Sequence, residues 1–211
     1  MSTASSAPSF TSRKQLGWWL LFMAWMLTVA VYSSGLSGTY LFDDYPNVVD
    51  NHGVQPHDAS VPSLVRAALS SPSSEFKRPL ASLSFAANYL TTGLDPYWMK
   101  LTNLVIHLLN GLLVFLLCKA LLWAASTKDV APDVAVSAKA NPEVTGARAD
   151  IVAALIATGW MLLPINLTAV LYVVQRMESM ANLFVLLGLI GYVSGRQRML
   201  GLTAASSPAP S

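Results

Sequence analysis

The chain has 211 residues, of which 54% are hydrophobic and only 11% are charged. A soluble domain carries about 25% charged residues, so this composition argues against an ordinary soluble globular protein. The net charge of +2 and the lack of basic clusters give no indication of a nucleic-acid partner. Cys118 is the single cysteine, which excludes a disulfide within the chain.

Long apolar runs predict the membrane-spanning helices. A helix needs about 20 apolar residues to cross the hydrocarbon layer, and its backbone must satisfy its own hydrogen bonds there. The runs do not alternate as the strands of a membrane β-barrel do. We therefore predict an all-α, polytopic integral membrane protein with about four transmembrane helices. The predicted spans are residues 17–35, 101–124 and 151–166, and then 167–194, which includes a short helix before the fourth span.

The first run has an alternative interpretation as a cleaved signal peptide. Its small-residue exit, Ser33-Ser34-Gly35, is compatible with cleavage. However, the apolar stretch is longer than the usual h-region of about 7–15 residues, and Trp18, Trp19 and Trp25 suit a membrane anchor better. The sequence therefore favours a retained helix.

Basic residues predict the orientation, because cytoplasmic segments carry more Lys and Arg. The basic residues beside the spans are Arg13, Lys14, Lys119, Lys128, Lys139, Arg148, Arg196 and Arg198. We expect a multi-pass protein of the plasma (inner) membrane with both termini and the linker 125–150 in the cytoplasm. The loop 36–100 is then external.

The segments between the spans differ in composition. Residues 1–16 and 195–211 are predicted to be disordered cytoplasmic ends, and 125–150 a flexible linker. In the external loop, Pro62 starts a predicted short amphipathic helix at the membrane surface, and Pro79 starts a second one.

Asp43 and Asp44 are the first candidate functional group. Adjacent carboxylates at reduced dielectric repel each other, which raises a carboxylate pKa and suits a general base. The alternative is a solvated acidic turn. A divalent metal has no support, because two adjacent carboxylates without a third ligand do not make a site.

Asn103, His107 and Asn110 form a polar stripe, since they share one face of the second predicted span. Polar groups at membrane depth need partners, so we expect this face to point into the helix bundle, with Asp43 and Asp44 at its outer mouth. Two interpretations remain open: hydrogen bonds between helices, or the wall of a polar cavity that opens outward.

Arg78, Gln175, Arg176 and Glu178 are the remaining polar candidates near the external side. Arginine suits a phosphate because its guanidinium donates two parallel hydrogen bonds. The alternative is an intramolecular ion pair or a contact with lipid headgroups. Just before this group, Pro164 is predicted to interrupt the third span.

Four segments in this order resemble a known family. They are residues 41–45 (LFDDY), 77–85 (KRPLASLSF), 101–110 (LTNLVIHLLN) and 170–179 (VLYVVQRMES). Together they resemble the N-terminal part of GT-C-type membrane glycosyltransferases, similar to bacterial relatives of the transmembrane and tetratricopeptide-repeat O-mannosyltransferases. Leu163 departs from the family pattern, which usually has His before the proline.

The resemblance implies transfer of a sugar from a polyprenyl-phosphate carrier to an acceptor outside the cytoplasm. It implies catalytic Asp43 or Asp44, and substrate-binding Arg78, Asn103, His107, Asn110, Gln175, Arg176 and Glu178. The implied partners are membrane lipid, the lipid-linked sugar, and another membrane subunit or a C-terminal remainder.

The alternative function is that of a non-catalytic membrane protein that serves in binding or assembly. A transporter or channel has less support, because no repeated half is found.

Overall fold

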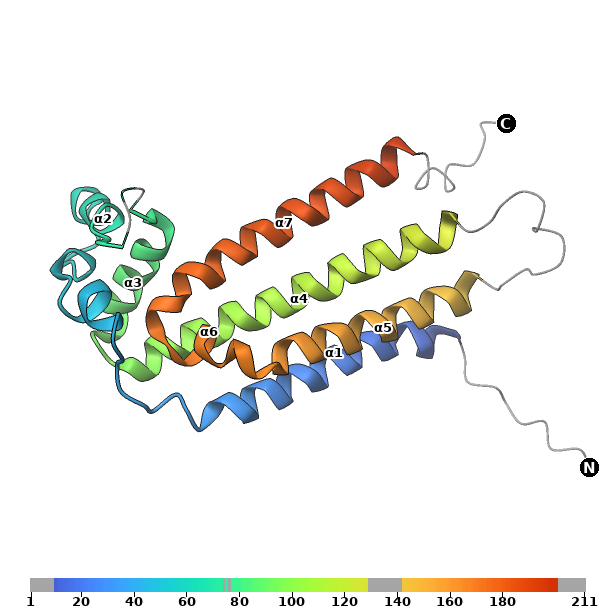
Figure 1. The fold of residues 1–211 in the computed structure, drawn as a ribbon, viewed down its shortest axis with the longest axis horizontal. Coiled ribbons are helices and arrows are strands. Elements are labelled where there is room, and N and C mark those ends of the chain that lie inside the picture. Colours follow the sequence, from blue (N-terminus) through green and yellow to red (C-terminus); the bar gives the residue numbers. More distant parts are fainter. Residues whose placement is uncertain (1–9, 74, 76, 129–141, 201–211) are drawn as a thin grey trace, which may run out of the picture. The chain divides into compact units, whose positions relative to one another are not determined.

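A computed structural model describes residues 10–73, 75, 77–128 and 142–200 (Figure 1). Within these ranges the regular structure is helical and no strand occurs. The chain is therefore all-α, as predicted. The α-helices are α1 (Phe10–Ser33), α2 (Val61–Ala68), α3 (Pro79–Thr92), α4 (Pro96–Lys128), α5 (Pro142–Leu162), α6 (Leu167–Leu171) and α7 (Arg176–Met199).

Three described helices are long and apolar enough to cross a membrane: Gln15–Ser33, Pro96–Ala125 and Val173–Met199. A fourth crossing results if Gly146–Leu162 and Pro164–Leu171, which are bent by 55° at their junction, form one span. Many large apolar side chains on these helices are exposed. Such surfaces need a lipid environment, so the chain is a helical membrane protein.

The third predicted span is interrupted where the sequence predicts it. Helix α5 ends at Leu162, and Pro164 begins the short turn η3 (Pro164–Asn166). Proline lacks the N–H that would continue the helix, and it disfavours helical geometry in the residue before it. After α6, a second short turn, η4 (Val173–Gln175), leads directly into α7.

Helix α4 is longer than the predicted span 101–124. It begins at Pro96, because Asp95 precedes it and accepts the N–H of Tyr97 over 2.9 Å. Helix also covers 126–128 and 142–150, so the prediction of a flexible linker is wrong at both of its ends. Residues 129–141 of that linker lie outside the described part.

The predicted disorder is also wrong beside the first and last spans. Residues 10–16 belong to α1, and residues 195–199 belong to α7. No proline lies in either stretch, so nothing stops the backbone hydrogen bonding of the adjoining span from continuing. Residues 1–9 and 201–211, also predicted to be disordered, lie outside the described part.

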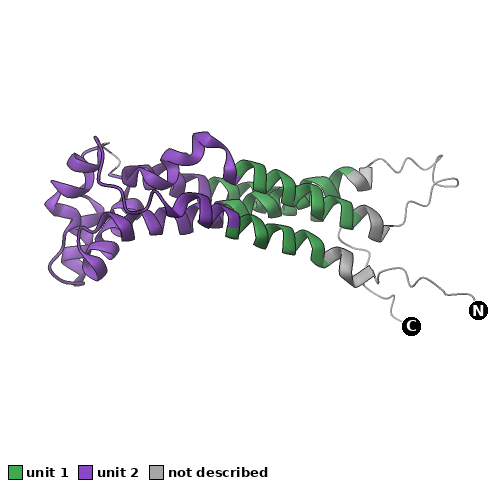
Figure 2. Cartoon of the chain, turned by 90° about the horizontal axis from the view of Figure 1, so that it is seen from below, with its two compact units in different colours: residues 1–26, 111–160, 185–211 green, residues 27–110, 161–184 purple. Residues whose placement is uncertain are grey.

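The chain divides into two compact units (Figure 2). The first unit comprises residues 1–26, 111–160 and 185–211. Within it, the ring of Trp18 meets that of Phe115 edge to face at 5.0 Å. Lys119 Nζ and Asp150 Oδ1 form an ion pair over 3.0 Å. Buried alanines of α5 allow close helix packing there.

The second unit comprises residues 27–110 and 161–184, and it contains every candidate site residue. Its apolar core consists of two clusters. One is Val48, Val54, Ala81, Phe85, Met99, Val173 and Met177, and the other is Tyr32, Leu36, Leu104 and Val170. The segment between α1 and α4 is thus folded onto the start of α7, with α2 and α3 as its two α-helices beside the short turns η1 (Tyr45–Val49) and η2 (His52–Val54).

Candidate functional site

The structure separates the two adjacent aspartates. Asp44 is completely buried, and its two carboxylate oxygens accept the backbone N–H of Leu41 (3.0 Å) and of Val174 (2.7 Å). Burial raises the pKa of Asp44, while these N–H bonds and the charge of Lys100 limit the rise. Both oxygens already have partners, so Asp44 fixes the loop to the segment before α7.

Asp43, in contrast, is exposed. Its backbone N–H donates to the Tyr172 hydroxyl over 2.9 Å, which fixes the main chain. Its carboxylate has no hydrogen-bond partner among the described residues and is accessible from solvent. Asp43 therefore meets the geometric requirement for a general base better than Asp44 does.

Strained backbone occurs next to Asp43 and at Arg78. Three residues other than glycine have a positive φ: Phe42 (33°), Lys77 (59°) and Arg78 (42°). The left-handed region costs a residue with a Cβ about 1–2 kcal/mol. Strain of this kind is often found where a side chain must be held for function. Here it occurs at the two loops that carry the exposed acid and the exposed base.

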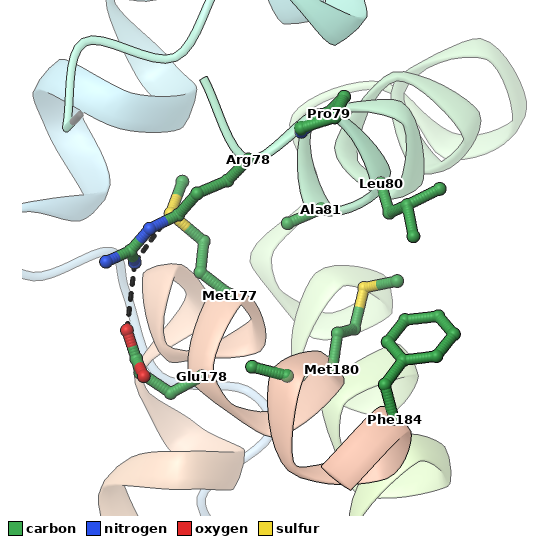
Figure 3. A pocket seen from close by; sticks show the side chains of 9 residues that line it. Arg78, Pro79, Leu80, Ala81, Met177, Glu178, Met180 and Phe184 are labelled. Atoms are coloured by element: carbon green, nitrogen blue, oxygen red, sulfur yellow. Dashed lines mark hydrogen bonds and ion pairs between the residues drawn. The ribbon is translucent and has the colours of Figure 1, made fainter. Parts of the chain in front are cut away.

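Arg78 lies at one end of an apolar groove of about 340 Å³ (Figure 3). Its Nη1 pairs with Glu178 Oε1 over 2.9 Å, and the two side chains are 40% and 59% exposed. Leu80 and Phe184 lie at the other end. The groove is lined by Arg78, Pro79, Leu80, Ala81, Met177, Glu178, Met180, Ala181 and Phe184. It combines one accessible guanidinium with an apolar channel.

Arg176 is not available to a ligand in the same way, because it is completely buried. Its Nε donates to Asn103 Oδ1 (2.8 Å), and its Nη2 donates to the Met99 carbonyl (2.7 Å). Its Nη1 lies 3.3 Å from Ser84 Oγ, and the guanidinium lies 4.5 Å from the centre of the Phe85 ring. These contacts use the donors of Arg176 within the fold.

The stripe of Asn103, His107 and Asn110 faces the interior, as predicted, since all three side chains are buried. Asn103 Nδ2 donates to the carbonyls of Val170, Tyr172 and Val173, from the end of α6 to the start of η4, at 3.2–3.3 Å. His107 Nε2 lies 3.0 Å from the Met161 carbonyl, and Asn110 Nδ2 lies 2.8 Å from the Ser179 carbonyl. This geometry favours hydrogen bonding between helices over a cavity wall.

Gln175 ends the turn η4, while α7 begins at Arg176. Gln175 therefore does not share one helical face with Ser179 and Asn182 of α7. Gln175 is half-buried, Ser179 is buried and Asn182 is exposed.

One short stretch, residues 172–178, connects the two strained loops. Tyr172 and Val174 bond the Asp43–Asp44 loop, and Glu178 pairs with Arg78. Sequence reasoning did not single out Tyr172, because a tyrosine at a helix junction carries no distinctive signal. The structure thus attaches the exposed acid and the exposed guanidinium to the same segment.

Two further polar residues near Asp44 were not predicted as site residues. Lys100 Nζ donates to the carbonyls of Gly38 (2.7 Å) and Thr39 (3.1 Å), which fixes the start of the loop. The Tyr40 hydroxyl is buried without a hydrogen-bond partner among the described residues. Its burial and the nearby charge of Asp44 raise the pKa of Tyr40 to about 12, although the charge of Arg176 opposes this rise.

The chain is similar in sequence to a protein with a known name. Over 172 residues the chain is 30% identical to the protein O-mannosyl-transferase Tmtc3 of Drosophila melanogaster. The chain is similar to a protein O-mannosyl-transferase. The aligned part is 78% of this chain, and the chain spans 18% of the length of that relative. No family model and no solved structure matches the chain. The resemblance to O-mannosyltransferases, inferred from the four motifs, is confirmed.

The described residues contain no cluster of three or more His, Cys, Asp or Glu that is suited to a metal ion.

The candidate site consists of Asp43, Arg78 with Glu178, and the apolar groove. Asp44, Asn103 and Arg176 position these parts and do not reach the surface.

Proposed function

We propose that the chain is the part of a GT-C-type glycosyltransferase that carries the acceptor-activating acid and a site for the lipid phosphate. The reaction transfers a sugar from a polyprenyl phosphate to a hydroxyl of an external acceptor. One observation carries this proposal. The loop of Asp43 and the loop of Arg78 both contact residues 172–178, the first by hydrogen bonds and the second by an ion pair. The similarity to a protein O-mannosyl-transferase supports it.

In this proposal Asp43 is the general base. The acceptor oxygen forms a bond to the anomeric carbon of the sugar as its proton passes to the Asp43 carboxylate. The bond between the anomeric carbon and the phosphate oxygen breaks, and the electron pair leaves with the polyprenyl phosphate. A positioned base typically contributes about 10²–10⁴-fold to such a step.

Arg78 stabilises the charge that develops on the departing phosphate. Its exposed guanidinium offers donors to phosphate oxygens, and Glu178 holds it in place until the ligand arrives. The apolar groove beside it receives the first isoprene units of the carrier. The flexible side chains of Met177 and Met180 suit a branched hydrocarbon chain.

The proposed setting is the plasma membrane, with both termini in the cytoplasm and residues 36–100 outside. This orientation follows from the basic residues in the first turns of α1 and the last turn of α7. Reporter fusions at residues 40–100 test it. A cytoplasmic signal from that loop would exclude an external acceptor.

The decisive experiment measures sugar transfer by membranes that contain the full-length chain, with radiolabelled polyprenyl-phosphate mannose and an acceptor peptide. Asp43→Asn should lower the turnover about 100-fold or more. Asp50→Asn, at an exposed acid in the same loop, is the matched control and should leave the turnover unchanged. Equal turnover in the Asp43→Asn protein and the wild type, at equal expression, would refute the role of Asp43.

A non-catalytic role in binding or assembly is the second candidate function. One observation favours it: the donors of Arg176 are used within the fold. Such a protein would retain the carrier lipid without transferring sugar. For this alternative we expect that the wild type binds the lipid-linked donor and transfers no sugar. We also expect that Arg78→Ala loses this binding.

A further inference from the structure

A second cavity lies in the loop segment of the second unit. Its volume is about 350 Å³, and its lining residues are His52, Gly53, Gln55, Pro56, His57, Ser63 and Arg66. These residues come from the turn η2 (His52–Val54), from the chain after it and from α2. The lining thus brings one guanidinium and two imidazoles together, and the glycosyltransferase proposal uses none of them.

The cavity wall is held by hydrogen bonds. Asn51 Oδ1 accepts the N–H of Gly53 over 3.1 Å, and Asn51 Nδ2 donates to the Ser70 carbonyl over 3.2 Å. Gln55 Nε2 donates to the carbonyls of Val48 (2.9 Å) and Val49 (2.7 Å). Two side-chain amides therefore fix the η2 turn against its neighbours, so the cavity is preformed.

The orientation of Gln55 determines the state of His52. Because Gln55 Nε2 donates to two carbonyls, its Oε1 is the atom that faces His52 Nδ1, at 3.3 Å. A carbonyl oxygen only accepts, so the hydrogen of a neutral His52 ring belongs on Nδ1. Its Nε2 then carries a lone pair, and it has no partner among the described residues. His52 can accept a hydrogen bond there, or take a proton and donate.

Arg66 provides the fixed positive charge of the cavity. Its Nη2 donates to Ser63 Oγ over 3.2 Å, which orients the guanidinium. The charge of Arg66 acts on Asp58, whose Oδ1 accepts both the N–H (3.0 Å) and the hydroxyl (2.6 Å) of Ser60. These bonds, that of Ser63 and the charge of Arg66 lower the pKa of Asp58 to about 2. No ion pair joins Asp58 to Arg66 within the described residues, so donors of Arg66 remain available.

We propose that this cavity binds a phosphate group that retains an ionisable proton, either as free phosphate or as a phosphomonoester. Its anionic oxygens accept hydrogen bonds from Arg66, and its P–OH faces His52 Nε2. One proton is shared between phosphate and imidazole, so the pair remains complementary whichever partner holds it. A sulfate or a phosphodiester lacks that proton, and the site should discriminate against both.

The test is calorimetric titration of the full-length protein in detergent with inorganic phosphate at pH 7. Saturable binding at a single site is expected. Arg66→Ala should weaken it about tenfold or more, since a hydrogen bond to a charged group contributes roughly 1.5–3 kcal/mol. Arg66→Lys keeps the charge and should retain part of the affinity. Arg198→Ala, at an exposed arginine at the end of α7, is the matched control and should bind like the wild type.

His52→Ala and sulfate test the sharing of the proton. His52→Ala should weaken phosphate binding severalfold but leave the weaker sulfate binding unchanged. Thermal unfolding of each variant establishes that the fold is retained. Equal affinity for phosphate and sulfate in the wild type, or phosphate binding that does not change in Arg66→Ala, would overturn the proposal.

Nanodiscs distinguish the two sources of the phosphate group. If the ligand is a lipid headgroup, phosphatidic acid in the nanodisc should compete with inorganic phosphate, and phosphatidylglycerol should not. If neither lipid competes, the ligand is free phosphate or a soluble phosphomonoester. Competition by phosphatidylglycerol that equals that of phosphatidic acid would contradict selection for a phosphomonoester. These results do not depend on whether the chain transfers sugar.

Discussion

Arg176 and Asn103 meet at the buried centre of the second unit, where the Nε–H of Arg176 donates to Asn103 Oδ1 over 2.8 Å. The amide nitrogen of Asn103 donates to the carbonyls of Val170, Tyr172 and Val173. Asn103 of α4 thus accepts a hydrogen bond from the buried guanidinium of Arg176 at the start of α7. It also donates to backbone carbonyls that have no helical partner where α6 ends.

Asn103→Leu should destabilise the protein, because the Nε–H of Arg176 loses its acceptor and the three carbonyls lose their side-chain donor. A buried donor or acceptor left without a hydrogen bond typically costs about 1–3 kcal/mol, and more when the group is charged. The double variant Asn103→Leu/Arg176→Met removes the unpaired charge and should recover part of the loss. Unfolding in detergent by heat or by dodecyl sulfate measures both effects. A single variant as stable as the wild type would show that water replaces Asn103.

Asp44→Asn should change how stability depends on pH. Burial raises the pKa of Asp44, so the folded protein holds this proton more tightly than the unfolded chain does. The resulting stability is fully present below the ordinary aspartate pKa of about 3.9, and it is lost as the pH rises through the raised value. The free energy of unfolding of the wild type, minus that of Asp44→Asn, should therefore fall as the pH rises from 3 to 7.

The asparagine also offers one acceptor where two N–H groups point at the carboxylate. A pH-independent loss of about 1–3 kcal/mol should therefore be added in the variant. Denaturation at a series of pH values separates the two contributions. A difference that grows with pH would show that the hydrogen bonds to the ionised form outweigh burial.

Glu178→Gln should strengthen binding of polyprenyl phosphate severalfold, because it removes the acid that pairs with Arg78. Arg78→Ala should weaken binding about tenfold, consistent with loss of a charge-assisted hydrogen bond. Both side chains are partly exposed, so their ion pair contributes no more than about 1 kcal/mol to stability. Fluorescent carrier lipid titrated into the purified protein measures the affinities. Arg148→Ala provides an exposed control, and unchanged affinity in Arg78→Ala would exclude the groove.

Gly53→Ala should disrupt the turn η2. A Cβ at this position would clash with the side chain of Ser70 and lie 3.0 Å from Asn51 Oδ1. Overpacking of this kind typically costs about 1–3 kcal/mol. Gly159→Ala is the control, because a Cβ there meets nothing within 4 Å and the residue lies within α5. If both alanine variants unfold at the wild-type temperature, the loop adjusts and the second cavity is not preformed.

Much of the fold follows from local properties of the sequence. The apolar runs are long enough to require helices in lipid. Pro164 interrupts one of these helices by its local backbone geometry, whatever the tertiary contacts around it. Helix ends were predicted less well. The beginning of α4 depends on Asp95 as a cap, and the outer turns of α1 and α7 extend beyond the apolar residues.

The sequence by itself determined that this is a helical membrane protein with a polar face on α4 and acidic and basic residues in one loop. The length of the apolar runs determines the membrane helices, and the helical period determines the polar face, so neither depends on contacts between distant segments. Only the tertiary structure distinguished Asp43 from Asp44 and Arg78 from Arg176. Each pair is alike in chemistry, and the members differ only in which backbone and side-chain groups of distant segments surround them. Burial and pairing across the fold therefore decide which charge stabilises the protein and which remains accessible to a ligand.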